Sequence, residues 1–547
     1  MRPIGRTMSS PPYAPESLEP GAFDAVVIGT GMGGATAGYA LAQRGWRVLF
    51  VEKGHFLFGD FDRGSGRIRD DANDGPAERM GRAEWPLPIF GDTSFGPLEF
   101  FAPLGCGTGG STSLYAAQLE RMHPRDFRPK ANHPGARDAT LPDAWPIAYE
   151  ELVPFYRRAE ALFRVTGTPD PLNPDPEANL LAPPPLSERD QDLFDSFESL
   201  GLHPYRAHAG IGFLPGCDGC PGVLCPRGCK SDAGRICLLP ALEKHGAKLL
   251  ADCEVLELEA DESVVRAARC RWQGKDVRVS AKLFVLAAGA LASPVLLLKS
   301  ASSAWPDGLA NRSGCVGRNL MFHASDFVAV RPRRRASEVG PRKALSLNDF
   351  YLHEGAKLGT FQSIGIAVDS GYVLYYLRSF FQKAPKWQRA VVAPFLRVIA
   401  RLAAFYFAGA AVFASIVEDL PYWNNRVVPD ARAKNGLRFE YTYPDELRER
   451  TRVSRQALGE SLRSRHRTLV LSGENNLNFG HTCGTCRFGD DPRTSVLDRN
   501  NRAHDVANLY VVDASFFPSS GGINPSLTIA ANALRAAEAM HRQLAAS

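Results

Sequence analysis

Hydrophobic and polar positions near the N-terminus alternate in a pattern that predicts two strands around a helix. Residues 23–28 (FDAVVI) are an apolar run rich in Val and Ile, which is typical of a buried parallel strand. A helical stretch over residues 35–44 follows, and a second apolar run, residues 47–51, ends at Glu52. The pattern predicts a βαβ unit and therefore an α/β fold for this region.

The segment between the first strand and the helix is rich in glycine. Gly29 permits a tight turn, Gly31 lets the backbone approach a pyrophosphate, and Gly34 lets helix and strand pack closely. Gly33 completes the run. Glu52 lies at the distance expected for an acid that binds a ribose hydroxyl, with the pyrophosphate at the helix N-terminus. The unit predicts a dinucleotide site without separating FAD from NAD.

A second helical pattern lies at residues 386–402, where apolar positions share one face and Pro394 would kink the helix. Such a basic amphipathic helix can lie on an anionic membrane surface, cover the substrate pocket or form an oligomer interface. Residues 402–417 are uncharged but too short to span a bilayer, so we expect buried core and no transmembrane helix. The face residues are Trp387, Val391, Phe395, Val398, Ile399 and Leu402, and the basic residues lying mainly off it are Lys386, Arg389, Arg397 and Arg401.

Composition excludes several classes of protein. The 547 residues are 44% hydrophobic and 22% charged, which excludes a disordered chain, a collagen-like fibre and a coiled coil. The net charge of +5 over this length does not predict nucleic-acid binding. The N-terminal segment lacks a signal-peptide pattern, so we expect a cytoplasmic protein, with peripheral membrane contact as the alternative location.

Five of the 11 cysteines fall between Cys217 and Cys237. Thiolates so close, separated by Gly and Pro turns, can converge on one metal centre. An iron–sulfur cluster, a zinc ion, and free thiols or disulfides are the three alternatives. The candidate ligands are Cys217, Cys220, Cys225 and Cys229.

Motifs spread along the chain carry a family resemblance. Together with the βαβ unit they resemble the glucose–methanol–choline (GMC) family of FAD-dependent oxidoreductases, from about residue 24 to about residue 540. The resemblance implies a Rossmann-like FAD-binding domain with an interleaved substrate-binding domain built on an antiparallel sheet, α/β by class and α+β overall. The motifs are residues 107–112 (GTGGST), 145–149 (WPIAY), 286–290 (LAAGA), 314–319 (GCVGRN), 418–421 (EDLP), 480–487 (GHTCGTCR) and 508–535.

The resemblance also implies the site. Family members transfer the α-hydride of an alcohol to flavin N5 while a His takes the hydroxyl proton, a task that suits the ordinary pKa of imidazole. His481 occupies that position and Asn524 that of its partner, whereas His323 is expected to be structural. Asp513 either contacts the cofactor or caps a turn. The expected cofactor contacts are Gly29, Gly31, Gly33, Gly34, Glu52, Gly109, Gly110, Ser111, the backbone of Val255, Asp513, Ala514 and Asn524.

Two departures point to a subfamily. Tyr115 stands where many members have Asn, and its segment is more similar to sugar and gluconate dehydrogenases of the family. Those dehydrogenases carry an iron–sulfur cluster on three cysteines, the last two spaced like Cys225 and Cys229. Long-chain alcohol oxidising members have similar cysteine-rich loops, for which a cluster is not implied.

These placements predict domains and function. We expect the FAD domain at residues 20–60, 100–130, 235–300 and 478–547, a cysteine-bearing insertion at 131–234 and the substrate domain at 301–477. The expected activity is oxidation of an alcohol to a carbonyl, with electrons passed to a quinone, a cytochrome or O2, and through an iron–sulfur cluster if one is present. The alternatives are an oxygen-using oxidase, a lyase or light-driven decarboxylase, and a protein that only binds.

The substrate is the least defined part of this expectation. Aromatic residues between Phe350 and Phe413 slightly favour a bulky apolar alcohol, whereas the Tyr115 segment favours a polyol or sugar.

Overall fold

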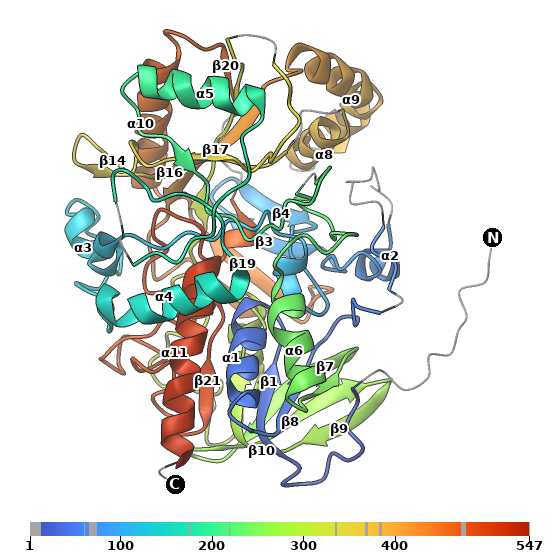
Figure 1. The fold of residues 1–547 in the computed structure, drawn as a ribbon. Helices are drawn as coiled ribbons and strands as arrows, with labels where there is room; N and C mark the ends of the chain where they lie inside the picture. The colour runs from blue at the N-terminus through green and yellow to red at the C-terminus, as the bar shows by residue number, and fades with distance from the viewer. Residues whose placement is uncertain are drawn as a thin grey trace.

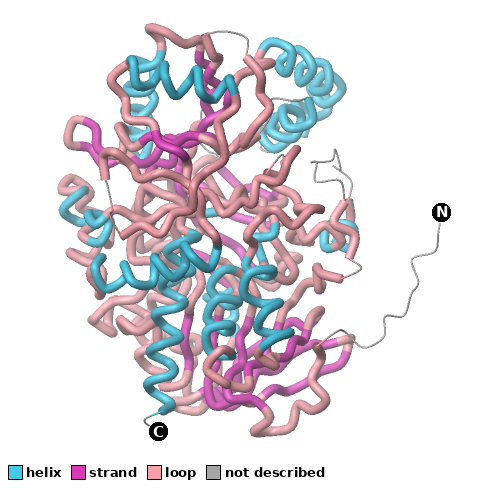
Figure 2. Tube along the Cα trace, viewed as in Figure 1, coloured by secondary structure: helices cyan, strands magenta, loops and turns pink. Residues whose placement is uncertain are grey.

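The computed structural model describes residues 13–59, 61–64, 74–173, 175, 177–217, 219–333, 336–366, 370–381, 386–471 and 477–545. Two main sheets occupy opposite halves of the molecule, and long loops fill much of the space between them (Figures 1 and 2). Segments far apart in the sequence therefore meet in the middle, where the candidate catalytic residues lie.

The lower half is built on a five-stranded parallel sheet with the order β21-β10-β1-β2-β6 (Figure 1). All four residues of β2 and five of the six of β1 are buried, as expected for strands covered on both faces. The predicted βαβ unit is confirmed. The strands are β1 (Phe23–Ile28), β2 (Val48–Val51), β6 (Lys248–Leu250), β10 (Ala281–Leu286) and β21 (Leu509–Val511).

Helices and a small antiparallel sheet cover this parallel sheet. Helix α1 packs against α11, and α11 packs against α4, while β7 contacts β2 and β8 contacts β10. The elements are α1 (Met32–Ala42), α4 (Tyr149–Phe163), α6 (Leu239–Lys244), α7 (Ala292–Lys299), α11 (Ser526–Ala545), β7 (Cys253–Ala260), β8 (Val265–Trp272) and β9 (Lys275–Val279).

The upper half is built on an antiparallel sheet, as the family resemblance implied. Its order is β20-β12-β17-β16-β13-β5, with β11 paired to β17. Helices α5 and α10 supply apolar residues to the core on one face. The elements are β5 (Tyr205–Arg206), β11 (His323–Ala324), β12 (Phe327–Val330), β13 (Leu345–Leu347), β16 (Gly359–Ser363), β17 (Ala411–Glu418), β20 (Thr468–Leu471), α5 (Glu188–Ser199) and α10 (Asp445–Leu462).

Smaller elements complete the fold. A four-stranded mixed sheet has the order β18-β19-β3-β4, and β14 pairs with β15. The bounds are α2 (Pro76–Met80), α3 (Pro129–Asn132), α8 (Ser370–Phe381), α9 (Lys386–Tyr406), β3 (Ile89–Thr93), β4 (Gly96–Phe100), β14 (Leu352–His353), β15 (Ala356–Lys357), β18 (Arg426–Pro429) and β19 (Leu437–Tyr441).

Two local expectations differ from the structure. Helix α1 begins at Met32, three residues earlier than predicted, so Gly33 and Gly34 lie in its first turn. The expectation that residues 402–417 form buried core is wrong for the first five, because they complete α9 and Leu402 is 64% exposed. After a turn at Gly409, with φ +82°, the chain enters the buried strand β17.

Candidate active site

The glycines of the βαβ unit are required by close backbone contacts. Gly29 has φ +95°, and a Cβ there would lie 2.4 Å from the Ala287 carbonyl oxygen. A Cβ on Gly33 would lie 2.1 Å from the Val512 carbonyl oxygen, at the end of β21. A Cβ on Gly34 would lie equally close, 2.1 Å, to the Gly29 carbonyl oxygen. The close packing that the sequence assigned to Gly34 is therefore shared with Gly33.

Gly31 differs from its neighbours because no atom lies within 4 Å of where its Cβ would stand. It is the N-cap of α1, and no side chain caps the first turn. Open space in front of backbone N–H groups at a helix N-terminus suits a pyrophosphate. These features fit the dinucleotide end of FAD.

The buried carboxylate of Glu52 holds the glycine-rich turn through hydrogen bonds. Its Oε2 accepts hydrogen bonds from the Thr30 hydroxyl (2.6 Å) and the Thr30 N–H (3.1 Å), and its Oε1 accepts one from the Gly54 N–H. Burial raises the pKa of this carboxyl. The Cys253 N–H donates to the Glu52 carbonyl at 2.9 Å, so β7 with Val255 begins beside the expected adenine end.

The expected flavin-side segments also converge. Gly109 and Gly110 have φ +93° and +53°, and a Cβ on Gly110 would lie 2.9 Å from the Gly31 Cα. Ser111 Oγ accepts from the Gly105 N–H at 3.1 Å. Asp513 caps the turn over residues 514–516 by accepting from the Ser515 N–H (2.9 Å). The cap is thus present, and cofactor contact by Asp513 and Ala514 stays a prediction.

His481 and Asn524 meet although 43 residues separate them. Asn524 Nδ2 lies 3.2 Å from His481 Nε2, and Asn524 is only 8% exposed. The Oδ1 atom of Asn524 is buried and has no hydrogen-bonding partner in the described part of the chain. The Asn524 N–H can donate to the oxygen of a substrate hydroxyl whose proton is taken by the neighbouring histidine, and the open Oδ1 can accept a second hydrogen bond from the ligand.

A second histidine, His323, determines the tautomer of His481. His323 Nε2 lies 2.8 Å from the Gly521 carbonyl, to which it must donate, and His323 Nδ1 lies 2.9 Å from His481 Nδ1. His323 Nδ1 is therefore the acceptor and His481 Nδ1 the donor, which leaves the lone pair of His481 on Nε2. Asn478 Nδ2 lies 3.2 Å from the same Nδ1, and in this tautomer it is only a contact.

Burial and neighbouring charge keep both rings neutral. Burial lowers the pKa of His323 to about 4. Burial also holds the pKa of His481 well below its usual value, and His323 and Lys343 lower it further. His481 is thus available as a base at neutral pH.

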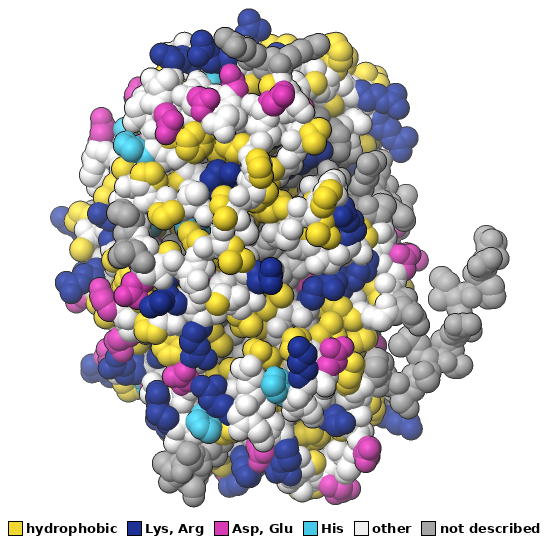
Figure 3. All heavy atoms as spheres, in the orientation of Figure 1, with side chains coloured by type: hydrophobic (Ala, Val, Ile, Leu, Met, Phe, Trp, Pro, Cys, Tyr) yellow, Lys and Arg dark blue, Asp and Glu magenta, His cyan; other side chains and the backbone are white. Residues whose placement is uncertain are grey.

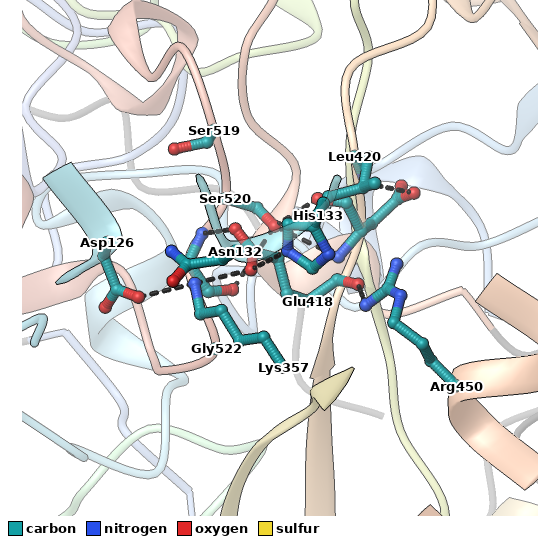
Figure 4. A network of polar contacts seen from close by, with 12 residues as sticks. Asp126, Asn132, His133, Lys357, Glu418, Leu420, Arg450, Ser519, Ser520 and Gly522 are labelled. Atoms are coloured by element: carbon teal, nitrogen blue, oxygen red, sulfur yellow. Dashed lines mark hydrogen bonds and ion pairs between the residues drawn. The ribbon is translucent and has the colours of Figure 1, made fainter. Parts of the chain in front are cut away.

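A buried ionic cluster, shown in Figure 4, is connected to His323 through the backbone of Gly521. Lys357 Nζ lies 2.5 Å from carboxylate oxygens of both Asp126 and Glu418, and His133 Nε2 lies 2.9 Å from Glu418. The Gly521 N–H donates to Glu418 Oε1 at 3.1 Å. The cluster therefore fixes the backbone that carries the acceptor of His323 and leads to Asn524.

Sequence reasoning missed the polar lining of the antiparallel sheet. Ser346 pairs with Gln362, so both side chains share one face, opposite the core formed by Phe361 and its neighbours. The Thr360 N–H donates to the Gly522 carbonyl at 2.9 Å, so β16 contacts the segment that leads to Asn524. Among the buried oxygens without a partner in the described chain are Gln118 Oε1, Glu120 Oε2, Thr360 Oγ1 and Gln362 Oε1.

The alternating sequence of β16, Thr-Phe-Gln-Ser, was the one signal that could have indicated this two-faced strand. Four of the aromatic residues that favoured an apolar substrate lie away from His481 and Asn524, whereas the Tyr351 hydroxyl accepts a hydrogen bond from the Gly522 N–H at 3.2 Å. Phe361 and Phe413 stack with ring centroids 4.8 Å apart in the core under α5 and α10. Phe395 and Phe405 are exposed on α9.

The cysteine loop is a compact unit beside Tyr115. The Tyr115 hydroxyl donates to the Ser231 carbonyl (2.7 Å), and buried Lys230 donates to three carbonyls, including Cys220 (2.9 Å). The Cys229 N–H donates to Cys225 Sγ at 3.1 Å. All four candidate ligands, Cys217 included, are free thiols. No three His, Cys, Asp or Glu side chains in the described ranges are arranged to hold a metal ion.

Sequence comparisons agree with this geometry. The GMC oxidoreductase family models match residues 99–325 and 445–533, and a model for an NAD(P)-binding Rossmann-like domain matches residues 27–89. The chain is 30% identical to 6'''-hydroxyparomomycin C oxidase of Streptomyces lividus, over 97% of this chain and 94% of that protein. The chain belongs to the GMC oxidoreductase family. It is therefore an FAD-dependent oxidoreductase that acts on CH–OH groups.

Other GMC proteins are similar over nearly the same length. Paromamine 6'-oxidase of Streptomyces fradiae is 29% identical over 95% of this chain and 91% of its own. The solved structure of pyridoxine 4-oxidase from Mesorbium loti has a TM-score of 0.62 at 20% identity, covering 95% of this chain and 99% of that one, and it supports the fold. No helix among the described residues is long and apolar enough to cross a membrane.

Proposed function

We propose that this GMC oxidoreductase oxidises a hydroxyl group of a polyhydroxylated compound, such as a sugar or polyol, to a carbonyl, with His481 as the base. The observation that carries the proposal is the pair of His481 Nε2 and the Asn524 Nδ2 donor, 3.2 Å apart, in a buried site with unsatisfied oxygens nearby. FAD, when bound, supplies the acceptor for the hydride.

The protein's own residues perform the remaining steps. The lone pair on His481 Nε2 accepts the substrate hydroxyl proton while Asn524 orients that oxygen. His323 holds His481 in the tautomer in which Nε2 is unprotonated and carries the lone pair. Because the pKa of His481 is lowered by burial, the ring is neutral before the reaction, and it releases the proton afterwards.

The substrate class rests on buried polar groups. In the described part of the chain, Gln118, Glu120, Thr360 and Gln362 each have a buried oxygen without a partner, and such oxygens are costly unless a ligand satisfies them. A substrate with several hydroxyl groups can donate to them, whereas a fatty alcohol cannot. Two relatives are named for paromamine and 6'''-hydroxyparomomycin C, which supports a polar substrate here.

We further propose that FAD contacts the predicted glycines, Glu52, Ser111, Val255, Asp513 and Ala514, and that electrons pass to an external acceptor. The described cysteine side chains do not form a metal-binding set. Iron–sulfur chemistry stays a prediction that iron analysis tests.

Anaerobic stopped-flow absorbance tests the function. We expect FAD absorbance to bleach on mixing with paromamine or glucose, and not with dodecan-1-ol. A His481→Ala variant that keeps FAD should bleach at least 100-fold more slowly. Bleaching by dodecan-1-ol alone would contradict the substrate class, and an unchanged rate in the variant would contradict the base. Peroxide formation in air would identify oxygen as the electron acceptor. Reduction of an artificial dye without peroxide formation would identify a carrier.

A further inference from the structure

Helices α8 and α9 form a hairpin at one edge of the antiparallel sheet, at the upper right of Figure 1. Its inner surface is a small core of its own, in which Leu374, Leu396 and Ala400 are no more than 7% exposed. That core uses only part of the apolar surface of α9. The predicted apolar face therefore does not cover buried structure but points outward.

The outward residues form a continuous apolar stripe. From Trp387 to Phe405 they recur every three or four residues, so they share one helix face and extend about 27 Å at 1.5 Å per residue. Eight of the 17 large hydrophobic side chains exposed in the described chain lie on this helix, so the stripe is a local concentration. The apolar stripe comprises Trp387, Val391, Phe395, Val398, Ile399, Leu402, Phe405 and Tyr406, between 42% and 84% exposed.

The charge around the stripe has one sign. Residues 370–417 contain six Lys and Arg and no Asp or Glu. Arg397 and Arg401 are exposed on α9. Arg397 lies close enough to Arg378 on α8 to contribute, after burial, to lowering the pKa of that guanidinium. Figure 3 shows hydrophobic and basic side chains next to each other at this edge.

We propose that the α8–α9 hairpin docks on an anionic lipid surface, with α9 parallel to the membrane plane. The apolar stripe would enter the boundary between headgroups and acyl chains, and the flanking arginines would contact lipid phosphates. A helix with aromatic and aliphatic residues on one face and only Lys and Arg as its charged residues has the composition of an interfacial helix.

Two other arrangements explain the surface less well. Helix α9 carries four basic residues in 21, so it does not span a bilayer. Self-association through the stripe would bring the arginines of two copies together with no acidic residue of the hairpin to pair with them. An anionic lipid surface would bury the apolar stripe and would also attract the basic side chains of α9.

Sedimentation of the FAD-loaded full chain with vesicles tests the proposal. We expect binding to vesicles of phosphatidylcholine mixed with phosphatidylglycerol, weaker binding at high salt and little binding to phosphatidylcholine alone. Replacing Trp387, Phe395 and Phe405 by Ser should abolish binding. Arg397→Gln with Arg401→Gln should weaken it about 30-fold, since each basic residue near an anionic surface contributes about 1 kcal/mol.

A matched control replaces three exposed leucines outside the hairpin, Leu172, Leu214 and Leu352, by Ser, and should bind like the wild type. Flavin absorbance establishes that each variant is folded. Failure of the wild type to bind anionic vesicles, or binding that survives the Trp387, Phe395 and Phe405 replacements, would overturn the proposal. So would a dimer in light scattering that those replacements dissociate, because the stripe would then be covered by a second copy.

Discussion

His323 and His481 face each other through their Nδ1 atoms, 2.9 Å apart, and the other ring nitrogen of His323 lies 2.8 Å from the Gly521 carbonyl. The sequence indicated a structural role for His323. We propose that it is also a positioning residue, because its tautomer decides which nitrogen of His481 carries the lone pair that accepts a proton.

Replacing His323 tests this relationship. His323→Leu should lower kcat by about 10- to 100-fold with little change in KM, because a hydrogen bond of about 1.5–3 kcal/mol is removed from the base and not from the substrate. His323→Asn retains an acceptor near the former Nδ1 and should recover part of the loss. Equal losses in the two variants would indicate a packing role only.

The pH dependence of the reaction should report on Lys343. Because burial, His323 and Lys343 all lower the pKa of His481, the base stays neutral below pH 6.5 and kcat/KM should decline only under more acidic conditions. Lys343→Met removes one positive charge, so the acid limb should move to higher pH. Steady-state profiles of both proteins measure this shift, and coincident acid limbs would count against it.

Two glycine replacements should separate cofactor binding from folding. Gly31→Ala places a methyl group in open space, so the apoprotein should keep its thermal stability while FAD affinity falls at least tenfold. Gly33→Ala places a methyl 2.1 Å from a backbone oxygen and should destabilise the apoprotein by about 1–3 kcal/mol. Melting curves with and without FAD distinguish the two, and the reverse pattern would be inconsistent with a site at Gly31.

The buried cluster in Figure 4 should make stability sensitive to acid. Burial alone would raise the pKa of Glu418, but Lys357 and His133 hold it well below the usual value. The cluster therefore stabilises fully above the unfolded-state pKa of the carboxyl and loses this contribution as pH falls toward the folded-state value.

Lys357→Met should cost about 3–5 kcal/mol in the free energy of unfolding, because two carboxylates stay buried without their ammonium partner. Denaturant melts at neutral pH measure the loss. Lys130→Met, at an exposed pair with Asp143, is the control and should change stability by less than about 1 kcal/mol.

The cysteine loop predicts an outcome for iron analysis. Protein purified without oxygen should contain about three or four iron atoms per flavin if a single cluster binds there. A ratio near zero would leave Cys217, Cys220, Cys225 and Cys229 as the free thiols seen in the structure. Cys225→Ser should then leave flavin reduction by substrate unchanged.

The sequence by itself determined the βαβ unit and the family. Both rest on short motifs, each made of residues that are close together in the sequence. Gly29, Gly31 and Glu52 lie within one strand–helix–strand unit, and His481 and Asn524 each lie in a short motif. Backbone sterics at glycine and the pKa of imidazole give such residues a chemical meaning before any contact is known.

Only the tertiary structure decided how those motifs act. The tautomer of His481 depends on His323, 158 residues away, and the polar groups proposed to meet the substrate come together only because Ser346 pairs with Gln362 across β13 and β16. The exposed stripe of α9 carries the same periodicity as a buried helix, so the sequence left several partners open. Periodicity reports that one face is apolar, whereas what lies against that face is fixed by chain segments packed from elsewhere.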